Sequence, residues 1–255
     1  MIKTNLIKKK IAAKEEVFGM LNSVPSATIT EMIAYAGYDF VILDTEHLLI
    51  KAEVLEHAIS AAKGLDLTVF VRVPDANQAA ISRALDAGAQ GIVVARVSDL
   101  QQAKKAVQAT YYPPLGERGI TGGKNTGFGT LPLSEYIDIA NQQIMLILMI
   151  ENIEGLDALP EIVKLDGIDM IIEGALDLSL SMGHQTDFNH SEVRENIQKI
   201  ASICQQANIT FCAIPRLPEQ LNQWREKGIY AFLAGEDRGV MFKALKTHLS
   251  QLKNI

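Results

Sequence analysis

The sequence predicts an α/β fold, a (β/α)8 TIM barrel in which residues 1–255 form a single domain. Three observations support it: short apolar runs alternate with helical patterns, this unit recurs eight times, and no linker or low-complexity tract interrupts the series. Alternating strands and helices imply parallel strands joined by right-handed crossovers. Eight such units in 255 residues also match the usual length of this barrel.

The predicted strands are nearly continuous apolar runs, many of them β-branched or aromatic, which is typical of strands buried on both faces. In chain order they are 17–21, 38–43, 67–73, 91–96, 144–150, 167–173, 209–214 and 229–234. Helical spacing of apolar residues is clearest over 52–64 and 191–207. The lysine-rich start, MIKTNLIKKKIAAKEEVFGM, predicts an extra amphipathic helix before the first strand.

A doubly wound open sheet is the competing architecture for the same alternation. Such sheets usually have fewer strands, and those that bind dinucleotides carry a glycine-rich first turn. The first turn here reads NSVPSAT and contains no glycine, so the barrel is the preferred prediction.

Composition argues against several classes of partner. Hydrophobic residues make up 48% of the chain and the net charge is −6, which suits a globular protein with a large core and disfavours nucleic acid as a partner. Lysines interrupt the N-terminal apolar residues and no apolar run approaches the roughly 20 residues of a membrane span, so neither a signal peptide nor a membrane partner is expected. Cys204 and Cys212 form no CxxC motif, which favours reduced thiols and a cytoplasmic location.

Ionisable residues gather where the predicted strands end. They are Asp44, Glu46 and His47 after the second strand, Arg72 on the third, Arg96 on the fourth, Glu151 after the fifth, and Glu173 and Asp177 at and after the sixth. In a (β/α)8 barrel, catalytic residues lie at the carboxyl ends of the strands. The sequence therefore predicts one active site at this end of the barrel.

Each residue also has a structural explanation on its own. Asp44 and Asp177 can cap the helices that follow them, His47 can be a structural histidine, and Arg72 can be an ion-pair partner. The functional interpretation rests on their joint position at one end of the barrel.

The residues at the strand ends suit metal-assisted chemistry. Glu151 and Asp177 offer two oxygen ligands of the kind that Mg²⁺ or Mn²⁺ prefers, and a cation held there polarises a keto acid. Arg72 adds a donor fork for an oxyanion or carboxylate. His47, oriented by Asp44 or Glu46, moves protons near neutral pH. Together these groups favour enolate chemistry next to a carbonyl.

The glycine-rich stretch YYPPLGERGITGGKNTGFGT (111–130) looks like a phosphate cradle. It lacks the Walker A and GxGxxG spacings, so a lid or packing loop is the preferred interpretation. Its Lys124 is the best candidate for a Schiff base, because no predicted strand carries a lysine near its carboxyl end. A metal-dependent reaction is therefore favoured over an imine route.

Several segments resemble the HpcH/HpaI family of metal-dependent class II aldolases. They are DTEH after the second strand, VRVPD on the third, LDAGAQGIVV, YYPPLGERG, and MIEN followed by GALDLSLSMG, which together span nearly the whole chain in order. The resemblance implies a barrel that assembles as a homo-oligomer, a dimer or a hexamer, with helices exchanged between subunits.

The resemblance also implies a role for each matching position. Glu151 and Asp177 would bind the metal, Arg72 would contact the keto oxygen of a pyruvate-like substrate, and His47 paired with Asp44 would be the acid/base. The other implied contacts are the backbone of Gly174, Ala175, Leu176 and Asp177 for the substrate carboxylate, and Asp86 for the site of a neighbouring subunit.

Three departures from the family pattern concern the substrate. Met149 stands where the family often has glutamine, Ala95-Arg96 replaces Pro-Met, and Glu173 precedes a Gly-Ala-Leu-Asp that replaces Gly-Pro-Ala-Asp. We expect Arg96 and Glu173 to share one space beside the metal. In that space they either pair and close the pocket, or Glu173 orients Arg96 toward a second substrate carboxylate.

Three functions stay open from the sequence. The first is an aldolase that acts on a pyruvate- or oxaloacetate-like keto acid. The second is a citrate synthase of siderophore biosynthesis, which the resemblance adds and which would condense oxaloacetate with acetyl-CoA. The third is a non-catalytic barrel that binds a metabolite, against which the metal pair, Arg72 and His47 argue.

Overall fold

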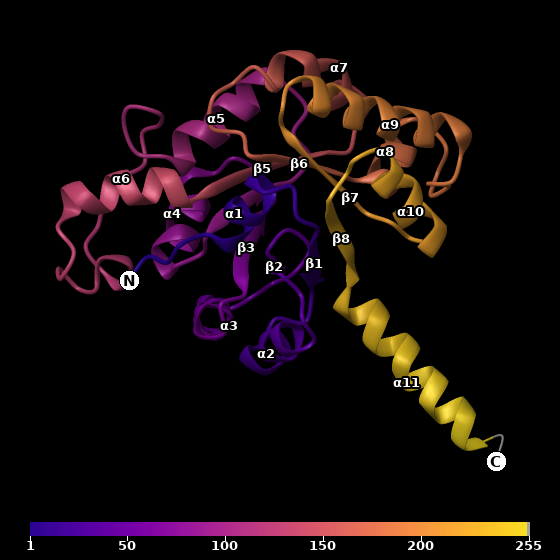
Figure 1. Ribbon diagram of the computed structural model, residues 1–255, viewed down its shortest axis with the longest axis horizontal. Helices are drawn as coiled ribbons and strands as arrows, with labels where there is room; N and C mark the ends of the chain where they lie inside the picture. The colour runs from indigo at the N-terminus through magenta and orange to yellow at the C-terminus, as the bar shows by residue number, and fades with distance from the viewer. Residues whose placement is uncertain (254–255) are drawn as a thin grey trace.

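Eight parallel strands form one closed barrel in the computed structural model, which describes residues 1–253 (Figure 1). In chain order the strands are β1 (Val17–Asn22), β2 (Phe40–Asp44), β3 (Thr68–Val73), β4 (Gly91–Val94), β5 (Met145–Ile150), β6 (Met170–Glu173), β7 (Thr210–Ala213) and β8 (Ala231–Glu236). Each strand pairs with the next, and β8 pairs with β1 to close the ring. The predicted barrel and its eight strands are confirmed.

Most helices surround the barrel and follow the strands in the expected alternation, except α1, which precedes the first strand, and α11, which extends away from the barrel. They are α1 (Leu6–Ala12), α2 (Ala27–Tyr35), α3 (Ala52–Gly64), α4 (Gln78–Ala87), α5 (Leu100–Thr110), the short 3₁₀ helix η1 (Lys124–Thr126), α6 (Leu133–Gln143), α7 (Ile153–Ile162), α8 (Ala175–Ser181), α9 (Ser191–Gln206), α10 (Pro218–Glu226) and α11 (Asp237–Lys253). The helices predicted over 52–64 and 191–207 are confirmed as α3 and α9.

Side chains of each strand alternate between two apolar cores, because successive residues point to opposite faces of a sheet. In β2, Phe40 and Ile42 belong to a cluster inside the barrel, whereas Val41 and Leu43 belong to a cluster between the strands and the helices. All four side chains are fully buried. This burial on both faces explains why the strands read as continuous apolar runs.

Helix α1 closes the amino-terminal end of the barrel. Its Ile7 is fully buried and packs with the cluster inside the barrel. Nδ2 of Asn5, which caps α1, donates to the carbonyl of Gln143 at 2.9 Å, just before β5. Lys8 forms an ion pair of 3.0 Å with Asp169, just before β6. The predicted N-terminal helix therefore blocks one end of the barrel and leaves the carboxyl ends of the strands for a site.

Helix α11 starts at the barrel and then projects away from it, as the yellow ribbon in Figure 1 shows. Asp237 at its start is buried and accepts hydrogen bonds from Nδ2 of Asn22 at 2.6 Å and from the amide of Ser23 at 2.8 Å. Beyond that anchor α11 exposes Val240, Phe242, Leu245, Leu249 and Leu252. Within residues 1–253, no helix is both long and apolar enough to cross a membrane.

Candidate active site

Arg72 and Asp44 form a buried ion pair at the carboxyl ends of β3 and β2. The two residues stand opposite each other in the register of these strands. Nε of Arg72 donates to Oδ1 of Asp44 at 2.9 Å, and Nη2 lies 2.9 Å from Oδ2. Burial by itself would raise the pKa of Asp44, but the hydrogen bonds and charge of Arg72 outweigh it and lower that pKa. Asp44 is therefore ionised and fixes the plane of the guanidinium group.

Glu46 and His47 lie beside the same guanidinium group. Nη1 of Arg72 is 3.3 Å from Oε2 of Glu46, and Nε2 of His47 is 3.7 Å from that oxygen. The His47 side chain is 57% exposed, so it is accessible to a substrate. The expected pairing of His47 with Asp44 is wrong, because both oxygens of Asp44 face Arg72 and Glu46 is the acid that contacts His47.

Backbone groups hold Glu151 on two sides. Its Oε1 accepts a hydrogen bond of 2.8 Å from the amide of Arg96, whose φ of 53° is a left-handed conformation uncommon outside glycine. On the other side, a Cβ atom at Gly174 would lie 2.4 Å from Oε2 of Glu151. Glycine at position 174 therefore allows the Glu151 carboxylate to lie against the turn that follows β6.

The Arg96 side chain contacts Asp177 and not Glu173. Its Nη1 is 3.2 Å from Oδ1 of Asp177, in the first turn of α8. Glu173 points to another element, and its Oε1 accepts a hydrogen bond of 3.1 Å from Nη1 of Arg216. The expected Arg96–Glu173 contact is therefore wrong, because each charge has its own partner on a neighbouring segment: α8 for Arg96 and the stretch after β7 for Glu173.

Glu173 organises the turn from β6 into α8. It is 2% exposed, its Oε2 accepts a hydrogen bond of 2.8 Å from the amide of Ala175, and its Oε1 accepts one of 3.1 Å from the amide of Ile214. Its partner Arg216 was not among the predicted residues. Arg216 nevertheless carries a similar sequence signal, a charge two residues after the predicted strand 209–214, in the segment IPR (214–216).

The backbone between β6 and α8 has fewer free amides than the sequence led us to expect. The Ala175 amide is bonded to the Glu173 carboxylate, and the Gly174 amide donates to the carbonyl of Ile150 at 3.2 Å. These two amides already have acceptors within the protein, so a substrate carboxylate would have to compete for them. Among the described residues, the amides of Leu176 and Asp177 have no protein acceptor.

Three carboxylates near the barrel mouth influence one another. Burial raises the pKa of Glu151 to about 7, and the charges of Asp177 and Glu46 add to the rise. Burial also raises the pKa of Glu46, against the opposing charge of Arg72. A cation relieves repulsion between carboxylates, and a donor set made only of oxygens suits Mg²⁺ or Mn²⁺. The residues present therefore fit a divalent cation of this kind.

Asp86 lies on α4 rather than at a strand end. Its Oδ1 is 2.6 Å from Nη2 of Arg118, whose side chain is fully buried. Arg118 in turn lies over the ring of Tyr112, 4.7 Å from its centroid. Within the described chain, this contact leaves Asp86 in a different place from the carboxylates of the barrel mouth.

The glycine-rich loop packs partly against α4 and α3. Asn125 is buried, and its Nδ2 donates to the carbonyl of Leu85 at 2.8 Å. Nζ of Lys124 lies 3.2 Å from the hydroxyl of Ser60 on α3. These contacts agree with the packing-loop interpretation for this part of the loop and direct the lysine toward α3.

Comparison with known proteins relates the whole chain to one family. A family model described as HpcH/HpaI aldolase/citrate lyase matches residues 18–243. A 5-keto-4-deoxy-D-glucarate aldolase from Enterobacter sp. (strain 638) is 31% identical over 94% of this chain and 93% of its own length. The structure of citrate synthase SbnG has a TM-score of 0.91 at 35% identity and covers 97% of each chain. An HpcH/HpaI aldolase from Desulfitobacterium hafniense DCB-2 has a TM-score of 0.93 at 27% identity, over 99% of this chain and 98% of that one.

Proposed function

Because this chain belongs to the HpcH/HpaI aldolase/citrate lyase family, we propose that it is a class II, metal-dependent carbon–carbon lyase or synthase. Its substrate is a pyruvate- or oxaloacetate-like 2-keto acid, which reacts through an enolate. The observation that carries this proposal is the set of groups at one end of the barrel: the carboxylates Glu151 and Asp177 stand with the buried Arg72 and the exposed His47.

Glu151 and Asp177 are the proposed metal ligands. When bound, Mg²⁺ or Mn²⁺ supplies Lewis-acid stabilisation of negative charge on a substrate oxygen. The Arg96 amide and the space left at Gly174 hold Glu151 in one orientation, with Oε2 free of hydrogen bonds to described residues. A carboxylate fixed before the ion arrives loses little freedom on binding, which favours affinity.

Arg72 and His47 are the proposed catalytic groups. Asp44 takes the Nε and Nη2 edge of the Arg72 guanidinium. Nη1 lies 3.3 Å from Oε2 of Glu46 and carries two N–H groups, so it is the nitrogen proposed to donate to the keto oxygen of the substrate as well. His47 takes or delivers the proton, because it is exposed at the mouth and Glu46 lies beside Nε2. Asp44 acts through Arg72, which makes it a positioning residue.

The substrate carboxylate binds at the start of α8. The amides of Leu176 and Asp177, which have no acceptor among the described residues, are the proposed donors to it, and Arg72 and Arg96 add positive charge at the same mouth. Gly174 and Ala175 contribute the shape of the turn, since their amides are bonded within the protein.

Citrate synthesis from oxaloacetate and acetyl-CoA is the second candidate function. One observation favours it: Arg96, whose side chain is 58% exposed, adds a cation beside Asp177 that suits a second substrate carboxylate. The 35% identity to citrate synthase SbnG over 97% of the chain supports it as well. Oxaloacetate has two carboxylates and pyruvate has one, so Arg96 would contribute only to the former.

A substrate panel with Mg²⁺ or Mn²⁺ tests these functions. The panel consists of pyruvate with aldehydes, oxaloacetate decarboxylation, and oxaloacetate with acetyl-CoA. The proposal expects turnover that a chelator removes and that Glu151→Gln abolishes, while Glu154→Gln, an exposed acid three residues away, keeps it. Absence of turnover with every substrate, together with binding of a keto acid, would support a non-catalytic metabolite-binding barrel instead.

The proposed molecule is a homo-oligomer, a dimer or a hexamer, of one barrel domain over residues 1–255. The uncovered apolar side chains of α11 support a helix exchanged with another subunit, and Asp86 is proposed to reach that subunit's site. The buried free thiols of Cys204 and Cys212 support a cytoplasmic location.

A further inference from the structure

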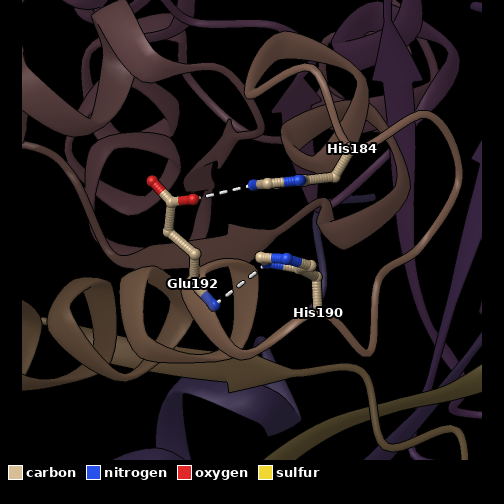
Figure 2. A group of neighbouring side chains, drawn as sticks. All are labelled: His184, His190 and Glu192. Carbon is tan, nitrogen blue, oxygen red and sulfur yellow. Dashed lines mark hydrogen bonds and ion pairs between the residues drawn. The ribbon is translucent and has the colours of Figure 1, made fainter.

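We propose a second metal site, suited to Zn²⁺, that is formed by His184 and His190 between α8 and α9 and by Glu192 in the first turn of α9 (Figure 2). One ligand atom from each of the three residues lies within 4.8 Å of the others. These residues are separate from the carboxylates of the barrel mouth, so this site does not rest on the proposed reaction.

The chemistry of the three donors differs from that of the barrel mouth. Two imidazoles and one carboxylate form a mixed nitrogen and oxygen set, which Zn²⁺ binds with a fourth position left for water. By the Irving–Williams order, the affinity of such a donor set is much higher for Zn²⁺ than for Mn²⁺. Mg²⁺ prefers ligands that are all oxygen. The two sites of this protein would therefore take different ions.

Local structure brings the three residues together. His184 follows the last turn of α8, where its amide donates to the carbonyl of Ser179 at 2.8 Å. His190 caps the start of α9, and its Nδ1 accepts a hydrogen bond of 3.3 Å from the amide of Glu192. Because Glu192 lies in the first turn of α9, its side chain returns toward His184, and its Oε2 lies 2.8 Å from Nε2 of that residue.

The two imidazole rings are stacked, with centroids 3.6 Å apart and planes 17° from parallel. Figure 2 shows Glu192 beside the same edge of both rings. An ion held there would replace the hydrogen bond between His184 and Glu192 and the long 3.3 Å bond from the Glu192 amide to His190. One of the two rings would tilt, so that the nitrogen lone pairs of both imidazoles point at the ion. The His184 side chain is 22% exposed and that of Glu192 58%, so the ion has a path from solvent.

A metal at this site would join the end of α8 to the start of α9. It would stabilise the connecting segment by binding the folded form and not the unfolded one. Each imidazole must be neutral to bind, so binding releases protons and weakens in acid.

Titration calorimetry of the full chain with Zn²⁺ tests the site, comparing wild type with His184→Ala and His190→Ala. The matched control is His57→Ala, an exposed histidine on α3, and every titration contains excess Mg²⁺ to occupy the barrel mouth. Loss of an outer partner of a metal site already costs about 10–100-fold in affinity, so each cluster variant should lose at least tenfold. The control should keep the Zn²⁺ affinity of wild type.

Two results would overturn the proposal: no Zn²⁺ binding by wild type, or unchanged affinity in both cluster variants. If a cluster variant fails to fold, electron paramagnetic resonance of Cu²⁺ on wild type decides, in the presence of Mg²⁺ to occupy the barrel mouth. Superhyperfine splitting from two imidazole nitrogens is expected, and a signal without nitrogen coupling would contradict the site.

Discussion

The amide of Arg96 donates a hydrogen bond of 2.8 Å to Glu151, while the guanidinium group of the same residue lies 3.2 Å from Asp177. One residue thus contacts both proposed metal ligands, through its backbone on one side and its side chain on the other. The backbone bond does not depend on the side chain, so a substitution at position 96 separates the two contacts.

Arg96→Met should raise the affinity for Mn²⁺ by up to about fivefold, because it removes a cation that pairs with Asp177. The estimate follows from the ~0.2–1 kcal/mol of an exposed ion pair. Manganese binding can be followed by electron paramagnetic resonance, with Arg96→Lys as the control that keeps the charge.

If Arg96 also binds a second carboxylate, the rate with oxaloacetate falls in Arg96→Met while the rate with pyruvate is kept. Equal effects on both substrates would contradict that role.

Gly174→Ala should weaken metal binding by at least tenfold. The added Cβ would lie 2.4 Å from Oε2 of Glu151, so the carboxylate must leave its position, and displaced groups around a metal typically cost about 10–100-fold. Gly64→Ala is the control, since a Cβ there meets no atom within 4 Å. Unchanged Mn²⁺ affinity in Gly174→Ala would show that Glu151 does not bind the metal in this orientation.

His47→Ala should lower turnover by about 10²–10⁴-fold while the affinity for a pyruvate analogue stays close to that of wild type. The reason is that an acid/base acts on the proton in the transition state and adds little to ground-state binding. Steady-state kinetics and equilibrium titration with the analogue measure the two quantities, and His57→Ala provides the control. An unchanged rate would make His47 a structural residue.

Asp44→Asn should lower the free energy of unfolding at pH 7 by at most about 3–5 kcal/mol, because it removes the closer of the two carboxylates that pair with the buried Arg72 and leaves only Glu46. The folded-state pKa of Asp44 is lowered, so its stabilisation is present above the unfolded value of about 3.9 and is lost as pH falls through the folded value. Denaturant unfolding should therefore show that the difference in free energy of unfolding between wild type and variant becomes smaller below pH ~4. The account would be contradicted if this free-energy difference did not change with pH. It would also be contradicted if the exposed control Asp157→Asn lost as much free energy of unfolding as Asp44→Asn.

Light scattering should give a mass that is a multiple of 27.9 kDa, the mass of one chain. The apolar side chains of α11 are uncovered in the single chain, so Leu245→Asp with Leu249→Asp should shift the population toward monomer. Lys246→Glu changes charge on the same helix and should leave the assembly intact. A wild-type mass near 27.9 kDa would exclude the oligomer and the role given to Asp86.

The sequence by itself determined the barrel and the end of it at which the candidate site residues gather. Continuous apolar runs between helical patterns indicate strands buried on both faces. This pattern lies within each segment, so each strand can be predicted without knowing its neighbours in space. Once eight parallel strands close, their carboxyl ends must meet, which brings Asp44, Arg72 and Glu151 to one mouth. The placement of these residues at strand ends was therefore predictable from order along the chain.

Only the tertiary structure decided which charge pairs with which. Glu173 ends β6 and Arg96 follows β4 by two residues, yet Arg96 pairs with Asp177 and Glu173 with Arg216. Likewise, stacking of His184 on His190 depends on the path of one connecting segment. These contacts depend on backbone angles such as the left-handed φ of Arg96 and on side-chain rotamers chosen among nearby partners. Hydrophobic periodicity carries no information about either, because it reports which face of an element is buried and not where a polar side chain points.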